Sequence, residues 1–297
     1  MWCCYNNLIL GLLAILLGFF GNNFLLVGKA AYAATTASAS YSTTLVLQHD
    51  LNVKLEFNKG QISITDIITL PASTEEKRFE FTLGKAFTIS NHPKDLHTVQ
   101  TSAQTILYQM PVIAQQTQIV LHYSAKIDST PHCQWLTETC RMFNETGLYL
   151  DQGSYWYPET ISGLHRFSLK VELPEGWSSI SQGVYHHDHW EEKQAQQNIY
   201  LIAAPFKHYH KNYNGIQISV YLRQDDVVLA ERYLQATEHY LALFSKQLGA
   251  YPYQKFATVE SFWETGWGMP SFTLLGSRVM RLPFIIDSAF AHEIMHN

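Results

Sequence analysis

The chain has 297 residues, of which 46% are hydrophobic, 13% aromatic and 15% charged, and its formal net charge is −5. This composition excludes a disordered or collagen-like chain, because it supplies ample apolar side chains for a core. No long basic run is present, which argues against a nucleic-acid partner. The length suits one large domain or two of ordinary size.

The first 33 residues have the features of a signal peptide. Residues 8–21 read LILGLLAILLGFFG, and Ala31-Tyr32-Ala33 has the small-x-small spacing of a cleavage site. The seven residues before the run contain no Lys or Arg, so an uncleaved membrane anchor over residues 8–28 is the alternative. Both interpretations predict export, with residues 34–297 in the periplasm, outside the cell, or facing outward from a membrane.

Four cysteines are present, and two of them, Cys3 and Cys4, precede the apolar run. Cys133 and Cys140 therefore form an isolated pair in the exported part. In an exported chain such a pair predicts a disulfide that closes a surface loop. A metal site is the alternative, although the spacing is not CxxC and no second pair exists.

Residues 34–222 are predicted to form an amino-terminal β domain. Apolar and polar residues alternate, as in half-buried strands, over 51–57, 79–83, 119–123, 167–173 and 216–222. After a turn at 58–60, Ile62, Ile64 and Ile67 are expected on the buried face of the return strand. Many short strands with frequent turns indicate an antiparallel sandwich or a saddle-shaped sheet.

The periodicity changes near residue 225, which places a domain boundary near 223. Six residues recur at intervals of three and four and predict one face of a helix: Leu229, Tyr233, Ala236, Tyr240, Leu243 and Phe244. Asp225 and Asp226 suit its N-terminus and Gly249 its end. A strand over 256–262, a loop over 263–270, an apolar run over 271–275 and a helix from about 286 are expected to follow.

The strongest functional signal is the sequence HEIMHN at residues 292–297. His292 and His296 are four residues apart, so a helix places both imidazoles on one face, where they can bind one cation. Neutral imidazole is a good zinc ligand, and zinc lowers the pKa of a bound water towards about 7. Glu293 can accept a proton from that water and pass it to a leaving amine. The pattern predicts one zinc ion, whereas the alternative is two solvated histidines on an ordinary helix.

Two other histidine groups are weaker candidates among the 14 histidines of the chain. His186-His187-Asp188-His189 has the composition of a metal cluster, but its turn-like surroundings favour a solvated hairpin tip. His208 and His210 alternate along a predicted strand, which is typical of a solvent-facing surface.

These residues resemble the M1 family of zinc aminopeptidases, the gluzincins typified by aminopeptidase N. The resemblance rests on HExxH followed by Asn297, on residues 240–262 with Tyr-Pro-Tyr at 251–253, and on residues 147–150 with 156–158. It implies a mainly β fold, in which an antiparallel β saddle or sandwich precedes a thermolysin-like α+β catalytic domain that begins at 223. It also implies a single zinc ion bound by His292 and His296, with Glu293 as general base, and peptide substrates cleaved near their amino terminus.

The family's substrate loop, GAMEN or GGMEN, is matched in part at residues 267–271. Gly268 and Met269 fit, and the resemblance implies that they bind substrate. Pro270 stands where the family has the Glu that binds the free α-amine, and a proline has neither a charge nor an N–H. A blocked peptide or a non-peptide substrate is therefore a further possibility.

Two nearby carboxylates are candidates for the missing amine-binding group. Glu260 and Glu264 lie a few residues before the loop and could serve in its place. The plain alternative is that both are ordinary charges beside a strand.

The third zinc ligand of the family is a Glu on the next helix, and residues 1–297 contain no such position. A catalytic zinc site normally has three protein ligands. The chain is therefore expected to be the amino-terminal portion of a longer metallopeptidase and to be inactive by itself. The alternative function is a secreted β-sandwich binding module with an inactive catalytic tail.

Overall fold

The structure is a computed structural model, and it describes residues 45–71, 78–91, 93–112, 117–126, 132–134, 139–160 and 163–297. The signal peptide or anchor predicted over residues 1–33 lies outside the described residues. Among the helices of the described part, none has the length and apolar character needed to cross a bilayer.

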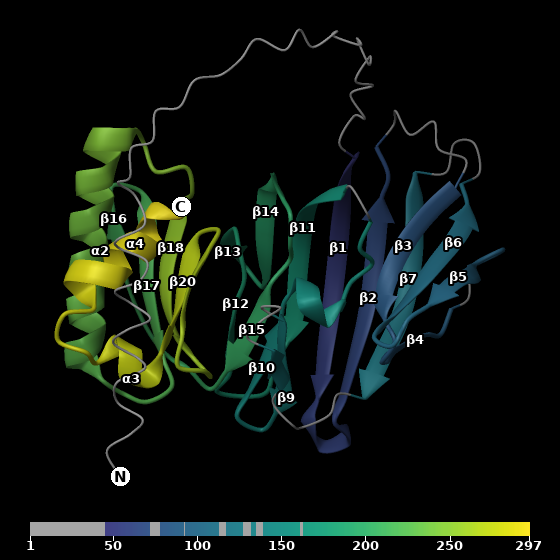
Figure 1. Cartoon of the computed structure of the whole chain (residues 1–297), viewed down its shortest axis with the longest axis horizontal. Helices are drawn as coiled ribbons and strands as arrows, with labels where there is room; N and C mark the ends of the chain where they lie inside the picture. Colours follow the sequence, from purple (N-terminus) through teal and green to yellow (C-terminus); the bar gives the residue numbers. More distant parts are fainter. Residues whose placement is uncertain are drawn as a thin grey trace, which may run out of the picture. The chain divides into compact units, whose positions relative to one another are not determined.

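The larger sheet of the amino-terminal part has the strand order β13-β14-β11-β1-β2-β7-β4 within the described residues (Figure 1). β1 and β11 are parallel neighbours, and the other pairs are antiparallel. Its strands are β1 (Leu45–Glu56), β2 (Gln61–Thr69), β4 (Phe87–Ile89), β7 (Gln118–Lys126), β11 (Gly163–Glu172), β13 (Val184–His186) and β14 (His189–Gln196), with the short helix η1 (Phe57–Lys59) between β1 and β2.

Two smaller antiparallel sheets accompany it in the described part of the chain. One has the order β12-β15-β10-β9-β8, with β8 (His132–Gln134), β9 (Thr139–Asn144), β10 (Gly147–Leu150), β12 (Ser178–Ile180) and β15 (Leu201–Ala204). The other has the order β3-β6-β5, with β3 (Arg78–Gly84), β5 (His97–Thr101) and β6 (Thr105–Pro111). The short helix η2 (Gln152–Ser154) follows β10. The mainly β fold class predicted from the sequence is confirmed.

The alternation of buried residues agrees with the sequence pattern on most strands but differs on β2. Ile62 and Ile64 are buried as expected, whereas the next buried position is Asp66 and not Ile67. Asp66 faces inward because Oδ2 lies 2.8 Å from Nδ1 of buried His49, and Nε2 of that histidine lies 3.1 Å from Nδ1 of buried His165. The three polar side chains Asp66, His49 and His165, on β2, β1 and β11, thus form a buried network in place of apolar packing.

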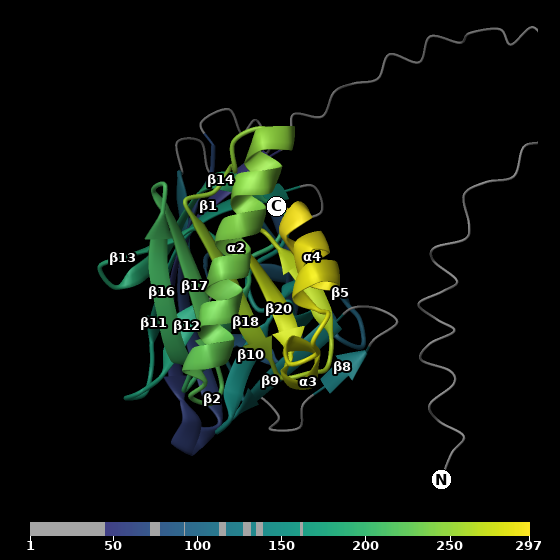
Figure 2. The ribbon, with the colours of Figure 1, turned by 90° about the vertical axis from the view of Figure 1, so that its left-hand side faces the viewer.

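The carboxyl-terminal part of the chain forms a mixed sheet with the order β16-β17-β18-β20-β19. Its strands are β16 (Lys207–Tyr213), β17 (Ile216–Leu222), β18 (Lys255–Ser261), β19 (Gly266–Met269) and β20 (Phe272–Gly276). The helices are α2 (Val227–Leu248), α3 (Ser277–Met280), the wider π-helical turn η3 (Ile286–Phe290) and α4 (Ala291–Met295). α2 and α4 lie on the same face of the sheet (Figure 2). Since β16 and β17 are hydrogen-bonded into this sheet, the predicted boundary near 223 falls inside it.

Helix α2 follows the expected signals at both ends. The Asp226 side chain accepts the backbone N–H of Leu229 at 3.0 Å, and Gly249 ends the helix with a φ of 112°. The buried face differs in one respect, because Leu243 is exposed and Leu241 is buried. That face also contains Thr237, whose hydroxyl donates to a carbonyl oxygen of the preceding turn. A pattern of apolar residues alone therefore does not identify every buried position of the helix.

The segment 263–270 was expected to be a loop, and that prediction is wrong for its second half. Gly266–Met269 forms the edge strand β19, which pairs antiparallel with β20. Two glycines in four residues give little intrinsic preference for a strand, so the pairing partner determines this element.

Lys255, at the start of β18, connects this sheet to the strands before it. Its ammonium donates to the carbonyl oxygen of Ser181 at 2.7 Å and lies 5.0 Å from the ring centroid of Trp190 and 5.4 Å from that of Phe272. Burial lowers the pKa of Lys255 to about 7, while the nearby Glu192 carboxylate acts in the opposite direction.

Candidate metal centre

The predicted zinc ligands lie together at the end of the chain on α4. Nε2 of His292 and Nε2 of His296 are 3.1 Å apart, and their rings are nearly perpendicular, with centroids 4.7 Å apart. Phe290 and Ile294 hold the helix against the core, with the Phe290 ring edge-on to Tyr233. The two imidazoles remain on the exposed side. The helical i, i+4 geometry predicted for the HExxH motif is therefore present.

The spacing of the two ring nitrogens suits a shared cation. Two nitrogen ligands at roughly 2.0–2.1 Å from one tetrahedral zinc ion stand about 3.3 Å apart, close to the separation of the two Nε2 atoms. Among the described residues, no group of three or more His, Cys, Asp or Glu side chains is arranged to hold a metal ion. The described residues therefore supply a two-histidine half-site.

Glu293 lies next to the pair and is buried, with 8% of its surface exposed. Its carboxylate packs against β19, since a β-carbon built on Gly266 would lie 3.3 Å from Oε1 and one built on Gly268 would lie 3.1 Å from Oε2. Burial raises the pKa of Glu293, and the charges of His296 and His292 oppose that rise. A partly desolvated carboxylate beside two imidazoles is chemically suited to proton transfer.

The predicted substrate residues Gly268 and Met269 face opposite sides of β19, as successive strand residues do. Gly268 lies under the helix, where an added β-carbon would stand 2.8 Å from Cβ of His296. Met269 is buried in the core on the other face of the sheet. Only the backbone of Met269 can therefore face a ligand along this strand.

The turn that follows β19 is tied to the end of the helix. Ser271 has a φ of 68°, and its backbone N–H donates to Oδ1 of Asn297. The Asn297 side chain also donates to the carbonyl oxygen of Glu293 at 3.4 Å. Asn297 thus links the position after Pro270 to α4, a role that its place after HExxH does not indicate.

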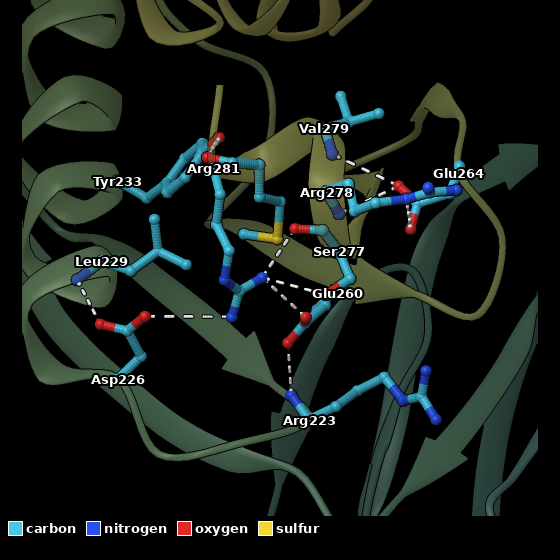
Figure 3. Close-up of polar contacts among 11 residues, drawn as sticks. Arg223, Asp226, Leu229, Tyr233, Glu260, Glu264, Ser277, Arg278, Val279 and Arg281 are labelled. Atoms are coloured by element: carbon cyan, nitrogen blue, oxygen red, sulfur yellow. Dashed lines mark hydrogen bonds and ion pairs between the residues drawn. The ribbon is translucent and has the colours of Figure 1, made fainter. Parts of the chain in front are cut away.

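The two carboxylates considered as substitutes for the amine-binding Glu are both engaged elsewhere (Figure 3). Glu260 accepts the backbone N–H of Arg223 at 2.7 Å and Nη1 of Arg281 at 2.9 Å. Glu264 accepts the backbone N–H groups of Arg278 and Val279 at 3.0 and 3.3 Å, and so caps α3. These contacts favour a structural role for both residues.

The other histidine groups behave as the sequence suggested. The segment 186–189 spans the turn between β13 and β14, with Asp188 ion-paired to Lys170 and Oδ1 of Asp188 3.2 Å from Nδ1 of His189. His208 and His210 lie side by side on β16, and both are exposed. Neither group belongs to a cluster of three potential metal ligands in the described part of the chain.

Cys133 and Cys140 are directly opposed in the antiparallel pair of β8 and β9. Their side chains lie outside what the structure describes, so the disulfide stays a prediction. The opposed backbone positions are compatible with it, because directly opposed residues of an antiparallel pair have Cα atoms about 4.5–5.5 Å apart, within the range of about 4.4–6.8 Å seen in disulfides.

Solved structures with a similar fold include M1 zinc metallopeptidases. The crystal structure of an M1 zinc metallopeptidase from Deinococcus radiodurans is similar with a TM-score of 0.65 and 14% sequence identity, over 84% of this chain and 63% of that chain. A mutant of an M1 zinc metallopeptidase from the same organism, bound to a Tyr-Ser-Ala substrate, has a TM-score of 0.62 and 15% identity, over 84% and 64% of the two chains.

This chain thus spans less than two thirds of the length of these structures. No protein-family model matches the sequence, and none of the curated proteins matches it. The identities are low, so the likeness concerns the fold. The described residues share the fold of M1 zinc metallopeptidases.

Proposed function

We propose that this chain is part of a zinc-dependent metallopeptidase that hydrolyses peptide bonds, with aminopeptidase-type action as the finer expectation. The observation that carries the proposal is the pair of Nε2 atoms 3.1 Å apart on one helix, with the Glu293 carboxylate packed beside them. The fold shared with M1 zinc metallopeptidases supports the same reaction class.

In this proposal His292 and His296 hold one zinc ion. The ion supplies Lewis-acid polarisation of a water molecule and of the scissile carbonyl. Because a catalytic zinc site normally has three protein ligands, we infer that the third ligand comes from residues of a longer chain beyond Asn297. The two-histidine half-site then accounts for the ligands found among the described residues.

Glu293 acts as the general base. Its carboxylate lies against the backbone of β19 at Gly266 and Gly268, which fixes its position beside the imidazoles. From there it takes a proton from the attacking water and delivers it to the leaving amine.

The substrate is expected to lie along β19 in an extended conformation. Among the described strands β19 pairs only with β20, so its other edge offers backbone N–H and C=O groups to a peptide. Gly268 lets that backbone approach the helix closely. Pro270 provides no charge for a free α-amine, so amino-terminally blocked peptides stand as substrates beside free ones.

The ligand assignment is tested by zinc titration of the metal-free chain in a calorimeter. The expected result is one weakly bound zinc ion, because two imidazoles form an incomplete site. His292→Ala and His296→Ala should each abolish the binding, whereas the exposed turn variant His186→Ala should not. Unchanged zinc stoichiometry in a variant that carries both His292→Ala and His296→Ala would show that neither histidine is a zinc ligand.

The catalytic assignment is tested on the gene product extended past Asn297. Glu293→Gln should retain zinc and lose at least about a thousandfold in kcat, since it keeps the shape and removes the base. Comparing a free peptide with its acetylated form then separates aminopeptidase action from cleavage of blocked peptides. Full activity of the Gln variant would contradict the assignment.

The alternative is an exported β-sandwich binding module with an inactive catalytic tail. It predicts that residues 34–297 fold, bind no zinc under dialysis and cleave nothing. Export remains part of the proposal, with a signal peptide over residues 1–33 or an anchor over residues 8–28. The disulfide between Cys133 and Cys140 belongs to it as well. Amino-terminal sequencing of the mature protein tests whether the signal peptide is cleaved.

A further inference from the structure

A cavity of about 420 Å³ lies near the carboxyl ends of β17 and β18, and its lining includes neither of the zinc-site histidines nor Glu293. Its charged lining residues come from separate segments. Glu145 lies in the turn between β9 and β10, Arg223 follows β17, Glu260 is on β18, and Arg281 follows α3. The volume lies within the range of small-ligand sites, which is about 300–1,000 Å³.

One wall of the cavity contains an ion pair between the exposed Arg281 side chain and the buried Glu260 carboxylate (Figure 3). Nη1 of Arg281 donates to Glu260 at 2.9 Å and to the carbonyl and hydroxyl oxygens of Ser277 at 2.7 and 3.1 Å. The other Glu260 oxygen accepts the backbone N–H of Arg223 at 2.7 Å. The Glu260 carboxylate, 2% exposed, is thus neutralised by Arg281 and satisfied at both oxygens. Glu260 therefore does not compensate the charge of the Arg223 guanidinium.

The opposite charges of Arg223 and Glu145 face the same cavity without meeting. Among the described residues, neither the Arg223 guanidinium nor the Glu145 carboxylate has an ion-pair partner within 4.0 Å, and they do not pair with each other. A lining with one free cation and one free anion suits a ligand that carries both charges.

The Phe262 ring lies next to the Arg223 guanidinium and to Gly147, two residues after Glu145. The Arg223 guanidinium carbon lies 5.2 Å from the centroid of the Phe262 ring. At the first residue of β10, a β-carbon built on Gly147 would lie 2.3 Å from the same ring, so the strand that follows the turn with Glu145 can approach the ring only because residue 147 is a glycine. The Arg223 guanidinium and the backbone that follows Glu145 therefore approach the same aromatic ring.

We propose that this cavity binds a dipeptide with two free termini, its α-carboxylate on the Arg223 guanidinium and its α-ammonium on the Glu145 carboxylate. Two residues of extended chain span roughly 7 Å. The two termini of a dipeptide can therefore reach the Arg223 and Glu145 side chains, which line one cavity but do not form an ion pair with each other. A guanidinium binds a carboxylate with two parallel hydrogen bonds. The site is independent of the zinc site, because they share no side chain.

The test is calorimetric titration of the chain with Ala-Leu, N-acetyl-Ala-Leu and Ala-Leu amide, with a chelator present so that only binding is measured. The chain should bind one Ala-Leu and bind the acetylated and the amidated peptides each at least about tenfold more weakly. Arg223→Gln should weaken Ala-Leu and the acetylated peptide by a similar factor. Glu145→Gln should weaken Ala-Leu and Ala-Leu amide by a similar factor and leave the acetylated peptide unchanged.

Both substituted side chains are exposed, so the fold is expected to persist, and unchanged circular dichroism checks this. His292→Ala should bind all three peptides as the unaltered chain does, which separates this site from the zinc site. Equal affinity for Ala-Leu and its acetylated form would overturn the proposal and leave a simple anion site. The absence of saturable Ala-Leu binding would overturn it as well.

Discussion

Gly268 lies under His296 so closely that a β-carbon at the glycine would stand 2.8 Å from Cβ of the histidine. The same β-carbon would lie 3.1 Å from Oε2 of Glu293 and 3.1 Å from Cδ2 of the His296 ring. The strand can therefore pass beneath both functional side chains only where it has no side chain of its own.

We predict that Gly268→Ala displaces the His296 ring and weakens zinc binding by the half-site about tenfold. Gly266→Ala is the matched control on the same strand, because its β-carbon would meet nothing closer than 3.3 Å. It should reduce the affinity less. Zinc titration of both variants provides the measurement, and a larger loss in Gly266→Ala would contradict the close approach at Gly268.

Lys255 should make the stability of the chain depend on pH in the alkaline range. Burial lowers the pKa of Lys255 to about 7, whereas an unfolded lysine titrates near 10.4. Between these values the unfolded state binds more protons, so the free energy of unfolding rises with pH by up to about 1.4 kcal/mol per unit.

Lys255→Met should remove this rise. Urea unfolding at pH 7, 8 and 9 measures the slope, and Lys54→Met, on an exposed position of β1, is the control. Equal slopes in Lys255→Met and in the unaltered chain would show that the buried ammonium is not responsible.

His165 should also make the free energy of unfolding rise with pH, but in the acidic range. Burial is the main reason that the pKa of His165 falls to about 3, and the nearby His49 adds to this effect. An unfolded histidine titrates near 6.5. The contribution of the neutral His165 ring to the free energy of unfolding is therefore complete above about pH 6.5 and is lost progressively as the pH falls below that value.

His165→Gln should flatten the dependence of the unfolding free energy on pH between 6.5 and 5. The comparison is with His186→Gln, since that histidine is exposed in the β13–β14 turn. A variant that keeps the full acid sensitivity of the unaltered chain would refute the role of the buried ring.

The predicted disulfide should contribute measurable stability. A bridge between Cys133 and Cys140 closes a short loop, for which chain entropy suggests a contribution of about 2 kcal/mol. Peptide mapping without reductant should find the two cysteines linked. The reduced chain and the Cys133→Ser/Cys140→Ser double variant should have equal unfolding free energies, both below that of the oxidised chain; no change on reduction would exclude the bridge.

Local patterns were sufficient to predict the parts of the site that depend on local geometry. The pairing of His292 with His296 follows from i, i+4 spacing on a helix, and the end of α2 at Gly249 follows from backbone chemistry. The apolar alternation of β3 and β7 likewise predicted their buried residues.

Features that depend on distant partners were not predictable in this way. Asp66 is buried because it meets His49, 17 residues away, and the His49 ring meets His165 at a separation of 116 residues. A periodicity argument prefers the apolar Ile67 at this point of β2. The strand β19 was missed for a similar reason, because its glycines favour no structure until β20 lies beside them.

Asn297 holds the turn at Ser271 through one side-chain atom and the backbone of Glu293 through another. The end of α4 and the end of β19 are therefore linked by hydrogen bonds through one side chain. If a peptide binds along this strand as proposed, it would meet Glu293 and the two imidazoles at a preset height, and its recognition would require little rearrangement of the protein.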